Sequence, residues 1–211
     1  MKTIYLVRHG QSESNVGEIQ RERASQLTPH GHEQAKILAE RCRNLPIDLV
    51  VSSGFPRAHD TARHIVEAIQ KPYEEAEMFG ERRPASSTVG LKRTDAVLVA
   101  YEKDFWSSFH DPEWRYEDSE NFADLKIRAA RCLEYLIARP EENILVVGHG
   151  LFVRVLIAYM AFEEELTGTE CLRLMRFLAT ENTGITVVTY EPERSRGEWH
   201  MQTWNDHAHL G

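Results

Sequence analysis

A chain of 211 residues with a net charge of −8 is long enough for one domain with a sizeable core, and it does not require two. Hydrophobic residues make up 42% and charged residues 27%, and no apolar run approaches the length of a membrane span, so we expect a soluble, cytoplasmic protein with no membrane partner and no targeting leader. The acidic balance disfavours nucleic acid as a partner, because binding to a phosphate backbone needs clustered lysine and arginine. Any anion bound here must therefore meet a local basic pocket.

Three cysteines at wide spacing, Cys42, Cys132 and Cys171, each stand inside an apolar periodic stretch. This pattern predicts buried free thiols and disfavours a disulfide framework or a zinc site. The closing stretch "GEWHMQTWNDHAHLG" is rich in histidine, but histidines spaced two apart near a chain end are more often solvated than metal-bound. We therefore expect no metal and no cofactor, and we expect Trp199 and Trp204 to anchor this stretch against the body of the protein.

The chain alternates between strand-like and helix-like patterns. In chain order we expect a strand at Thr3–Val7, a helix from the N-cap Thr28 to about Arg43, a strand at Asp48–Ser52, a helix at Pro56–Ile69, a helix from Ser119 to just before Pro140, a strand at Asn143–Val147, helices at Leu151–Met160 and Glu170–Leu178, and a strand at Gly184–Tyr190. Such alternation predicts an α/β fold, with a mostly parallel central sheet and helices on both faces, in a single domain over residues 1–211.

Residues 78–117 break the alternation, and we expect them to form an inserted segment over the sheet. The segment is rich in aromatic side chains, namely Tyr101, Phe105, Trp106, Phe109, Trp114 and Tyr116. Aromatic residues at helix-like spacing form a small core more often than a ligand pocket, so we expect a core here. Basic residues of the same segment either form a solvated face or meet a second anionic group on a ligand: Arg82, Arg83, Lys92 and Arg93.

Two predicted strands end in similar sequences, "IYLVRHG" at residues 4–10 and "ILVVGHG" at residues 144–150. Each places a histidine, His9 or His149, directly before a glycine that leaves room for a sharp turn and a close ligand. In open α/β sheets ligands bind outside the carboxyl ends of the strands. The two histidines are therefore expected to face one crevice.

A third predicted strand ends in "SSGFPRAHDTA", which places Arg57 in the first turn of the following helix. Together with Arg8 it offers forked, permanently charged donors that suit the oxygens of a phosphoryl group. The N-termini of the helices near Pro56 and Leu151 add backbone N–H groups that favour an anion. These residues predict an anion site that contains a nucleophile.

The chain resembles a known family, the histidine phosphatase superfamily, also called phosphoglycerate mutase-like (branch 1). The similar segments are "LVRHGQSESN", "LTPHGHEQA", "VVSSGFPRAHDTA", "DSENFADLKIRAARCL" and "ILVVGHG". They occur in the order of the family and span residues 6–150. A set of motifs at these spacings is far more specific than one Arg-His-Gly triplet.

The resemblance implies a role for each matching residue. His9 is expected to be the nucleophile that takes the phosphoryl group, without a metal. The groups expected to bind the oxygens of that phosphoryl group are Arg8, Arg57, His149, Asn15 and the start of the helix at Gly150 and Leu151. The flanking arginines should keep His9 neutral near pH 7, because they disfavour a further positive charge. Asn15 has a second interpretation, as the cap of a turn.

The family also requires a carboxylic acid that protonates the leaving group and then activates water. The stretch "EEAEMFGERRPAS" resembles the acid segment of the family most closely at Glu81, with Glu77 as the nearest rival. In this chain "RRPAS" stands where the family commonly carries a further glycine-bearing stretch. The proton donor is therefore predicted to be Glu81, with Glu77 as the alternative.

The resulting hypothesis is a metal-independent phosphomonoesterase that acts on a small-molecule phosphate ester through phosphorylated His9. The first alternative is a mutase that moves phosphate between the hydroxyls of a phosphoglycerate. The segment after Asn15, "VGEIQRERASQLT", lacks the Gly-Trp loop that the mutases of the family carry there. The second alternative is a module that binds phosphorylated ligands without turnover. Neither the physiological ester nor the oligomeric state follows from the sequence.

Overall fold

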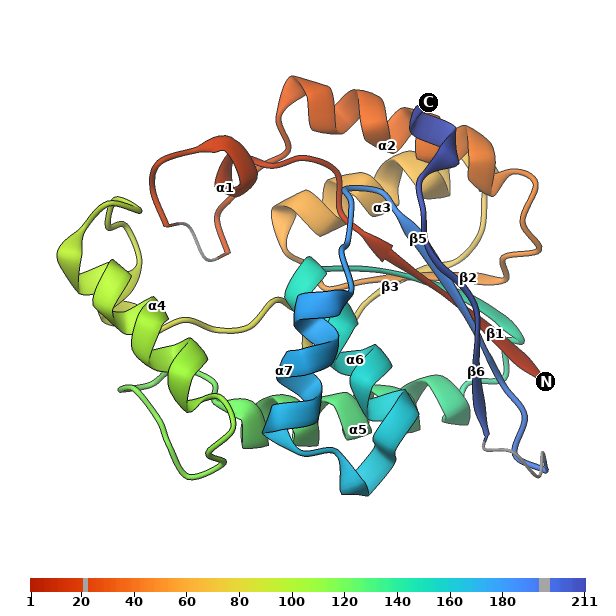
Figure 1. Cartoon of the computed structure of the whole chain (residues 1–211). Helices are drawn as coiled ribbons and strands as arrows, with labels where there is room; N and C mark the ends of the chain where they lie inside the picture. The colour runs from red at the N-terminus through yellow and green to blue at the C-terminus, as the bar shows by residue number, and fades with distance from the viewer. Residues whose placement is uncertain (21–22, 194–197) are drawn as a thin grey trace.

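The computed structural model describes residues 1–20, 23–193 and 198–211. Within these residues six strands form one sheet in the order β3-β2-β4-β1-β5-β6 (Figure 1). Their bounds are β1 Lys2–Arg8, β2 Leu49–Ser52, β3 Tyr73–Glu75, β4 Asn143–Gly148, β5 Ile185–Tyr190 and β6 Trp199–Asp206. Strands β1 to β4 pair in parallel, whereas β5 runs antiparallel to β1 and β6 antiparallel to β5. The predicted mostly parallel sheet is confirmed.

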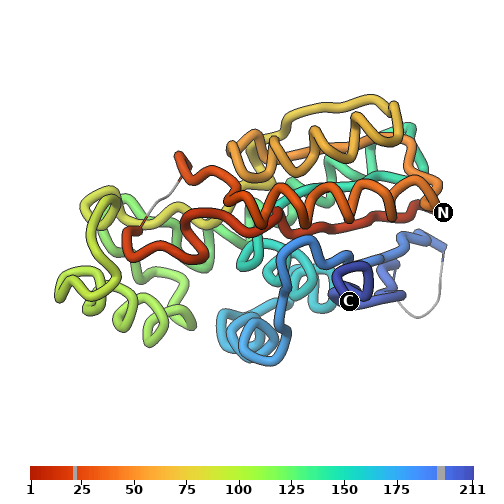
Figure 2. Tube along the Cα trace, turned by 90° about the horizontal axis from the view of Figure 1, so that it is seen from above, coloured from red at the N-terminus to blue at the C-terminus, as the bar shows by residue number. Residues whose placement is uncertain are grey.

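Helices cover both faces of the sheet, as the sequence predicted (Figures 1 and 2). The described helices are α1 Glu13–Val16, α2 Pro29–Cys42, α3 Pro56–Ile69, α4 Ala96–Ser108, α5 Phe122–Ala138, α6 Gly150–Phe162 and α7 Gly168–Phe177. Side chains alternate along β1, so Tyr5 and Val7 pack toward α2 and α3 while Ile4 and Leu6 pack toward α5 and α6. Each face of the sheet therefore has its own apolar core.

The helix starts show why the predicted boundaries were close. Thr28 caps α2, and its Oγ accepts the N–H of Gly31 at 3.0 Å, as predicted. The third predicted helix starts later than Ser119, at Phe122. Asn121 is the actual cap of α5, because its Oδ1 accepts the N–H of Asp124 at 3.0 Å while the carboxylate of Asp124 accepts the N–H of Asn121 at 3.2 Å.

Two edge strands, β3 and β6, were not predicted. Strand β6 is formed by the histidine-rich closing stretch, which pairs with β5. Trp199 and Trp204 are partly buried against the larger core, which confirms that they anchor this stretch. The three cysteines are free and buried, as predicted, and burial raises the pKa of each thiol to about 12.

The inserted segment holds two short 3-10 turns, at Glu77–Phe79 and Ser86–Thr88, followed by α4. Its aromatic residues Tyr101, Phe105 and Phe109 are each 1% exposed and belong to the larger core, so the expectation of a core rather than a pocket is confirmed.

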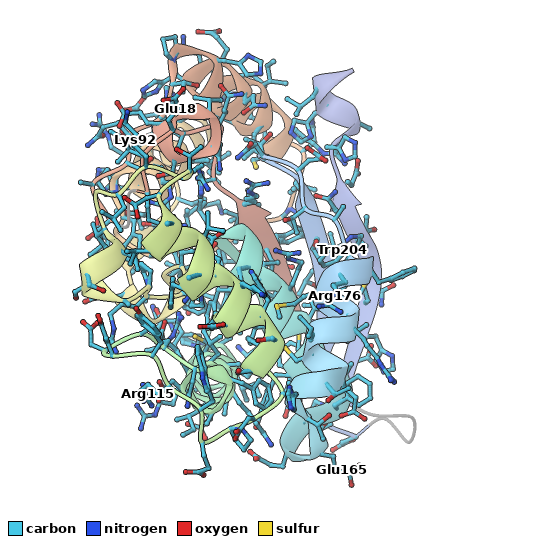
Figure 3. All side chains as sticks on the ribbon, turned by 60° about the vertical axis from the view of Figure 1, so that its left-hand side comes forward. Glu18, Lys92, Arg115, Glu165, Arg176 and Trp204 are labelled. Carbon is cyan, nitrogen blue, oxygen red and sulfur yellow. The ribbon has the colours of Figure 1, made fainter. Side chains whose placement is uncertain are left out.

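The insertion also meets the loop that follows β1. Ile19 and Lys92 form an isolated antiparallel bridge, and Glu18 lies next to Lys92 in Figure 3. The guanidinium of Arg93 donates to the carbonyls of Ser14 (2.6 Å) and Gly17 (3.1 Å). The insertion thereby holds the α1 turn from outside. In the described part of the chain, no helix is long and apolar enough to cross a membrane.

Candidate active site

A polar cavity of about 470 Å³ lies at the carboxyl end of β1. It brings together residues from β1, the α1 turn, the start of α3, the insertion and the start of α6. The predicted site residues that line it are Arg8, His9, Asn15, Arg57, Glu81, Gly150 and Leu151. His149 is fully buried and lies against His9, with 5.1 Å between the ring centroids, rather than on the cavity wall.

The imidazole of His9 is held in one tautomer. Its Nδ1 lies 2.7 Å from the carbonyl oxygen of Gly10, which only accepts, so Nδ1 carries the proton. Its Nε2 accepts from Nε of Arg57 at 3.1 Å and therefore keeps its lone pair on the side of the arginine. Burial, followed by the charges of Arg57 and Arg8, lowers the pKa of His9 well below 6.5. The predicted effect of the arginines on the charge of His9 is confirmed, although burial is the larger cause.

His149 follows β4 and is equally constrained. Its Nε2 lies 2.8 Å from the hydroxyl of Ser53, and the ring of Phe55 lies beside the imidazole, tilted by 58°, with 5.0 Å between the ring centroids. Burial and the charge of Arg57 lower the pKa of His149 well below 6.5, so it is neutral near pH 7. Within the described residues, its Nδ1 is a buried nitrogen without a hydrogen-bond partner.

Arg8 and Arg57 approach the cavity from different elements. Arg8, at the end of β1, donates from Nη1 to the carbonyl of Thr180 at 2.6 Å. Its Nε is also buried and without a partner among the described residues. Arg57 lies in the first turn of α3 and is 4% exposed. Two permanent positive charges are therefore fixed beside His9, with burial lowering the pKa of Arg8.

Asn15 both caps a turn and lines the cavity. Its Oδ1 accepts the N–H (2.9 Å) and the hydroxyl (3.1 Å) of Ser12, and also Nδ2 of Asn182 at 3.3 Å. These contacts fix which end of the amide is the acceptor. The NH₂ end of Asn15 remains as a donor.

Glu81 lies at the same cavity, on the segment between the first two turns of the insertion. Its carboxylate accepts the N–H groups of Leu151 (3.2 Å), Phe152 (3.1 Å) and Arg82 (3.0 Å). The start of α6, which the sequence assigned to the phosphoryl group, thus holds Glu81 here. A carboxylate at a helix N-terminus is stabilised by the N–H groups and the helix dipole.

The family model of the histidine phosphatase superfamily (branch 1) matches residues 4–207. The chain belongs to this family. Membership confirms the predicted family and enzyme class.

Relatives within the family carry both phosphatase and mutase names. The chain is 30% identical to a probable phosphoglycerate mutase GpmB of Proteus mirabilis (strain HI4320), with 100% of this chain and 95% of the relative covered. It is 29% identical to a putative phosphoserine phosphatase 2 of Hydrogenobacter thermophilus (strain DSM 6534 / IAM 12695 / TK-6), with 92% and 93% covered. A phosphoserine phosphatase from Entamoeba histolytica, solved in complex with phosphoserine, shares the fold, with a TM-score of 0.79, 24% identity and 100% of both chains covered.

The rival acid, Glu77, lies outside this cavity. It pairs with Arg23, and its side chain is 67% exposed. These two residues and Glu81 itself help to line a second, smaller hollow. Of the two candidate acids, only Glu81 lines the cavity of this histidine phosphatase that contains His9.

Several residues of the site were not predicted from the sequence. Arg154, one turn into α6, donates to the carbonyls of Gly150 (2.9 Å) and Met175 (2.6 Å) and lines the cavity. Asn182 donates to the carbonyl of His9 at 2.8 Å as well as to Asn15. Only the i+4 spacing from Gly150 to Arg154 could have indicated a link to the motif, whereas Asn182 lies in a loop without a distinguishing pattern.

The basic residues of the insertion differ in whether they line the cavity and in what they contact. Arg82 lines the cavity, donates to the hydroxyl of Tyr101 and stacks over the ring of Phe105 at 3.9 Å. Arg93 also lines the cavity, while its donors hold the α1 turn. Arg83 instead contacts residues 118 and 120. No group of three or more metal-ligating side chains occurs in the part of the chain that the structure describes.

Proposed function

We propose that this histidine phosphatase is a phosphomonoesterase that hydrolyses a small phosphate ester through a phosphohistidine intermediate on His9. The observation that carries the proposal is the state of His9. It is neutral, its Nδ1–H is fixed on the carbonyl of Gly10, and its Nε2 lone pair lies 3.1 Å from Nε of Arg57. A neutral, oriented imidazole beside fixed positive charge is suited to attack phosphorus.

In the first step the hydrogen bond from Arg57 Nε to Nε2 of His9 breaks, Nε2 forms a bond to phosphorus, and the bond from phosphorus to the ester oxygen breaks. Arg8 and Arg57 stabilise the equatorial oxygens, and the buried Arg8 Nε offers a further donor, as does His149 Nδ1 in the tautomer whose Nε2 accepts from Ser53. The protonated form of Glu81 gives its proton to the departing alkoxide. The products are the free alcohol and phosphorylated His9.

In the second step water attacks the phosphorus of phosphorylated His9. The Glu81 carboxylate takes a proton from that water, and the bond between Nε2 and phosphorus breaks. Orthophosphate leaves, His9 returns to its neutral state, and Glu81 is again protonated. The cycle uses one water and no redox chemistry.

The experiment is release of phosphate from p-nitrophenyl phosphate in excess EDTA by the wild type and by His9→Ala. We expect turnover by the wild type that His9→Ala abolishes, and an alkali-stable, acid-labile phosphoryl adduct after rapid quenching of the wild type. Equal turnover by both proteins would refute the role of His9. Loss of wild-type turnover on addition of EDTA would refute metal independence.

A mutase is the second candidate, because a relative named as a probable phosphoglycerate mutase covers the whole chain at 30% identity. The two reactions differ in the acceptor of the phosphoryl group. Incubation with labelled phosphoglycerate separates them: a mutase transfers label between the 2- and 3-hydroxyls faster than it releases orthophosphate, and a phosphatase does the reverse. We expect release to exceed transfer, since the Gly-Trp loop of family mutases is missing after Asn15.

A further inference from the structure

We propose that Arg128, acting together with Glu120, is a positioning residue that fixes the general acid Glu81. The inference rests on the proposed function, because it concerns protonation of the leaving group. Arg128 lies on α5 and Glu120 just before it, and neither lines the cavity that contains His9. Their side chains are only 16% and 13% exposed, respectively.

The guanidinium of Arg128 holds the backbone on the N-terminal side of Glu81. Its Nη1 donates to the carbonyls of Met78 (2.9 Å) and Gly80 (2.7 Å). Gly80 is the residue directly before the acid. A shift of this carbonyl would move the start of the Glu81 side chain.

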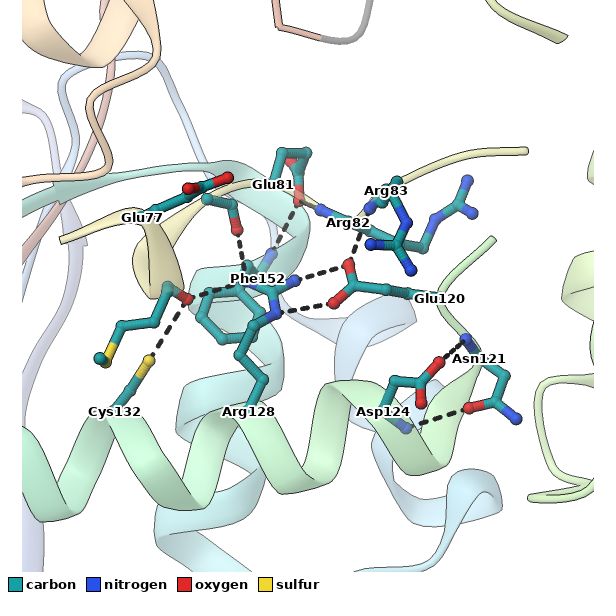
Figure 4. A network of polar contacts seen from close by, with 12 residues as sticks. Glu77, Glu81, Arg82, Arg83, Glu120, Asn121, Asp124, Arg128, Cys132 and Phe152 are labelled. Carbon is teal, nitrogen blue, oxygen red and sulfur yellow. Dashed lines mark hydrogen bonds and ion pairs between the residues drawn. The ribbon is translucent and has the colours of Figure 1, made fainter. Parts of the chain in front are cut away.

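Glu120 holds the backbone on the other side. Its carboxylate accepts Nε (2.8 Å) and Nη2 (2.9 Å) of Arg128, and it also accepts the N–H of Arg83 at 2.8 Å. The N–H of Glu120 donates to the carbonyl of Arg83 at 3.0 Å. The segment that carries Glu81 is thus fixed both before and after the acid by one ion pair (Figure 4).

Arg128 also links this segment to α6. Its guanidinium carbon lies 3.7 Å from the centroid of the Phe152 ring, and the N–H of Phe152 donates to Glu81 Oε1 at 3.1 Å. The backbone of Glu81 and the helix end that holds its carboxylate therefore rest on the same guanidinium. This arrangement sets the position of the acid relative to the phosphoryl site.

Stabilisation of the fold does not by itself explain why Arg128 and Glu120 form a buried ion pair. Replacing a buried ion pair by apolar residues of similar volume is often neutral or stabilising. A fork of planar donors, however, can meet a carboxylate and two carbonyls at once, which the compact ammonium of lysine cannot do. Because a misplacement of about 1 Å can cost roughly 100-fold in rate, such rigidity matters most where a proton must be delivered.

The test compares two esters of almost the same shape, phenyl phosphate and p-nitrophenyl phosphate. Phenolate is the more basic leaving group and depends more on a proton from Glu81. We expect Arg128→Lys to lower kcat/KM for phenyl phosphate about tenfold more than for p-nitrophenyl phosphate. Glu81→Gln should show the same selectivity, and in that background Arg128→Lys should add less than threefold.

Arg115→Lys is the matched control. Arg115 forms a forked pair with Asp124 at 2.6 and 2.9 Å near the start of the same helix, but it does not contact residues 78–83. We expect Arg115→Lys to affect both esters equally. Should Arg128→Lys fail to fold in a circular-dichroism melt, Glu120→Gln, which preserves shape and removes charge, takes its place in the same comparison.

The outcomes are distinct. Equal losses for the two esters, or a selectivity that persists undiminished in the Glu81→Gln background, overturn the positioning role while leaving the proposed function intact. A wild type that turns over neither ester refutes the proposed function, and the inference falls with it.

Discussion

Arg57→Gln separates two roles that the proposed mechanism gives to one guanidinium, opposing protonation of His9 and binding the phosphoryl oxygens. Arg57 Nε donates to His9 Nε2 at 3.1 Å, and both side chains are 4% exposed. Two unit charges about 4 Å apart repel by roughly 4 kcal/mol at an effective dielectric constant of 20. The charge of Arg57 is therefore strong enough to oppose protonation of His9, and in the proposed mechanism the same group binds the phosphoryl oxygens.

The substitution raises the pKa of His9 toward its ordinary value of 6.5, because burial continues to lower this pKa but the charge of Arg57 no longer does. Since the reaction needs neutral His9, kcat/KM falls as the pH drops through this pKa. The acidic limb of the pH profile should therefore move to higher pH in Arg57→Gln. Well above pH 6.5, the remaining loss is that of one oxyanion donor, about 100- to 1,000-fold in kcat.

The assay is kcat/KM for p-nitrophenyl phosphate from pH 4.5 to 8.5. Arg63→Gln is the control, because Arg63 lies on the same helix, pairs with Glu67 at the surface and is 61% exposed. Its profile should match the wild type. An Arg57→Gln enzyme that loses activity by the same factor at every pH would show that Arg57 does not hold His9 neutral.

The other predictions concern stability and orientation. Below pH 6.5 the histidines of the unfolded chain become protonated, whereas buried His9 and His149 stay neutral in the folded protein, so the free energy of unfolding should fall by up to about 1.4 kcal/mol per pH unit for each histidine. In urea unfolding from pH 7.5 to 5.5, the free energy of unfolding should fall less steeply with pH for His149→Gln than for the wild type. An unchanged pH dependence would contradict this prediction. Asn182→Asp should reduce phosphatase activity more than Asn182→Ala, because both variants lose the donor to the carbonyl of His9 but the carboxylate also repels that carbonyl and turns the Asn15 amide toward itself, whereas a mere packing role gives the opposite order. Gln70 caps the C-terminal end of α3 with a φ of 55°, a left-handed conformation that glycine adopts without steric cost. Gln70→Gly should therefore raise the free energy of unfolding by about 0.5–1 kcal/mol in thermal melts, and a lower melting temperature would contradict this.

The strands that carry the chemistry were predictable because they are buried on both faces. Such strands read as continuous apolar runs, and each run ends where its polar site residues begin, at Arg8 and at His149. The edge strands lack this signal. Strand β3 has the sequence "YEE" with exposed glutamates, and it forms because β2 offers it a free edge.

The same contrast separates the predicted from the unpredicted site residues. His9, Arg57 and His149 stand next to strand ends, where topology places side chains at the ligand-binding edge. Arg154 and Asn182 reach the site through tertiary packing of α6 and of the loop before β5, which no local pattern encodes. Glu81 was found only through the family resemblance, since its setting depends on α6 meeting the insertion.

Beside the positive charge of the cavity lie buried nitrogens, Arg8 Nε and His149 Nδ1, that have no hydrogen-bond partner among the described residues. Arg8, Arg57 and Arg154 line this space together with Glu81, and burial lowers the pKa of both Arg8 and Arg154. Buried polar atoms without partners are uncommon in folded proteins and carry a free-energy cost. A dianionic phosphoryl group would offset that cost by accepting from these donors. It would also compete with Glu81 for the backbone N–H groups of Leu151 and Phe152 at the start of α6.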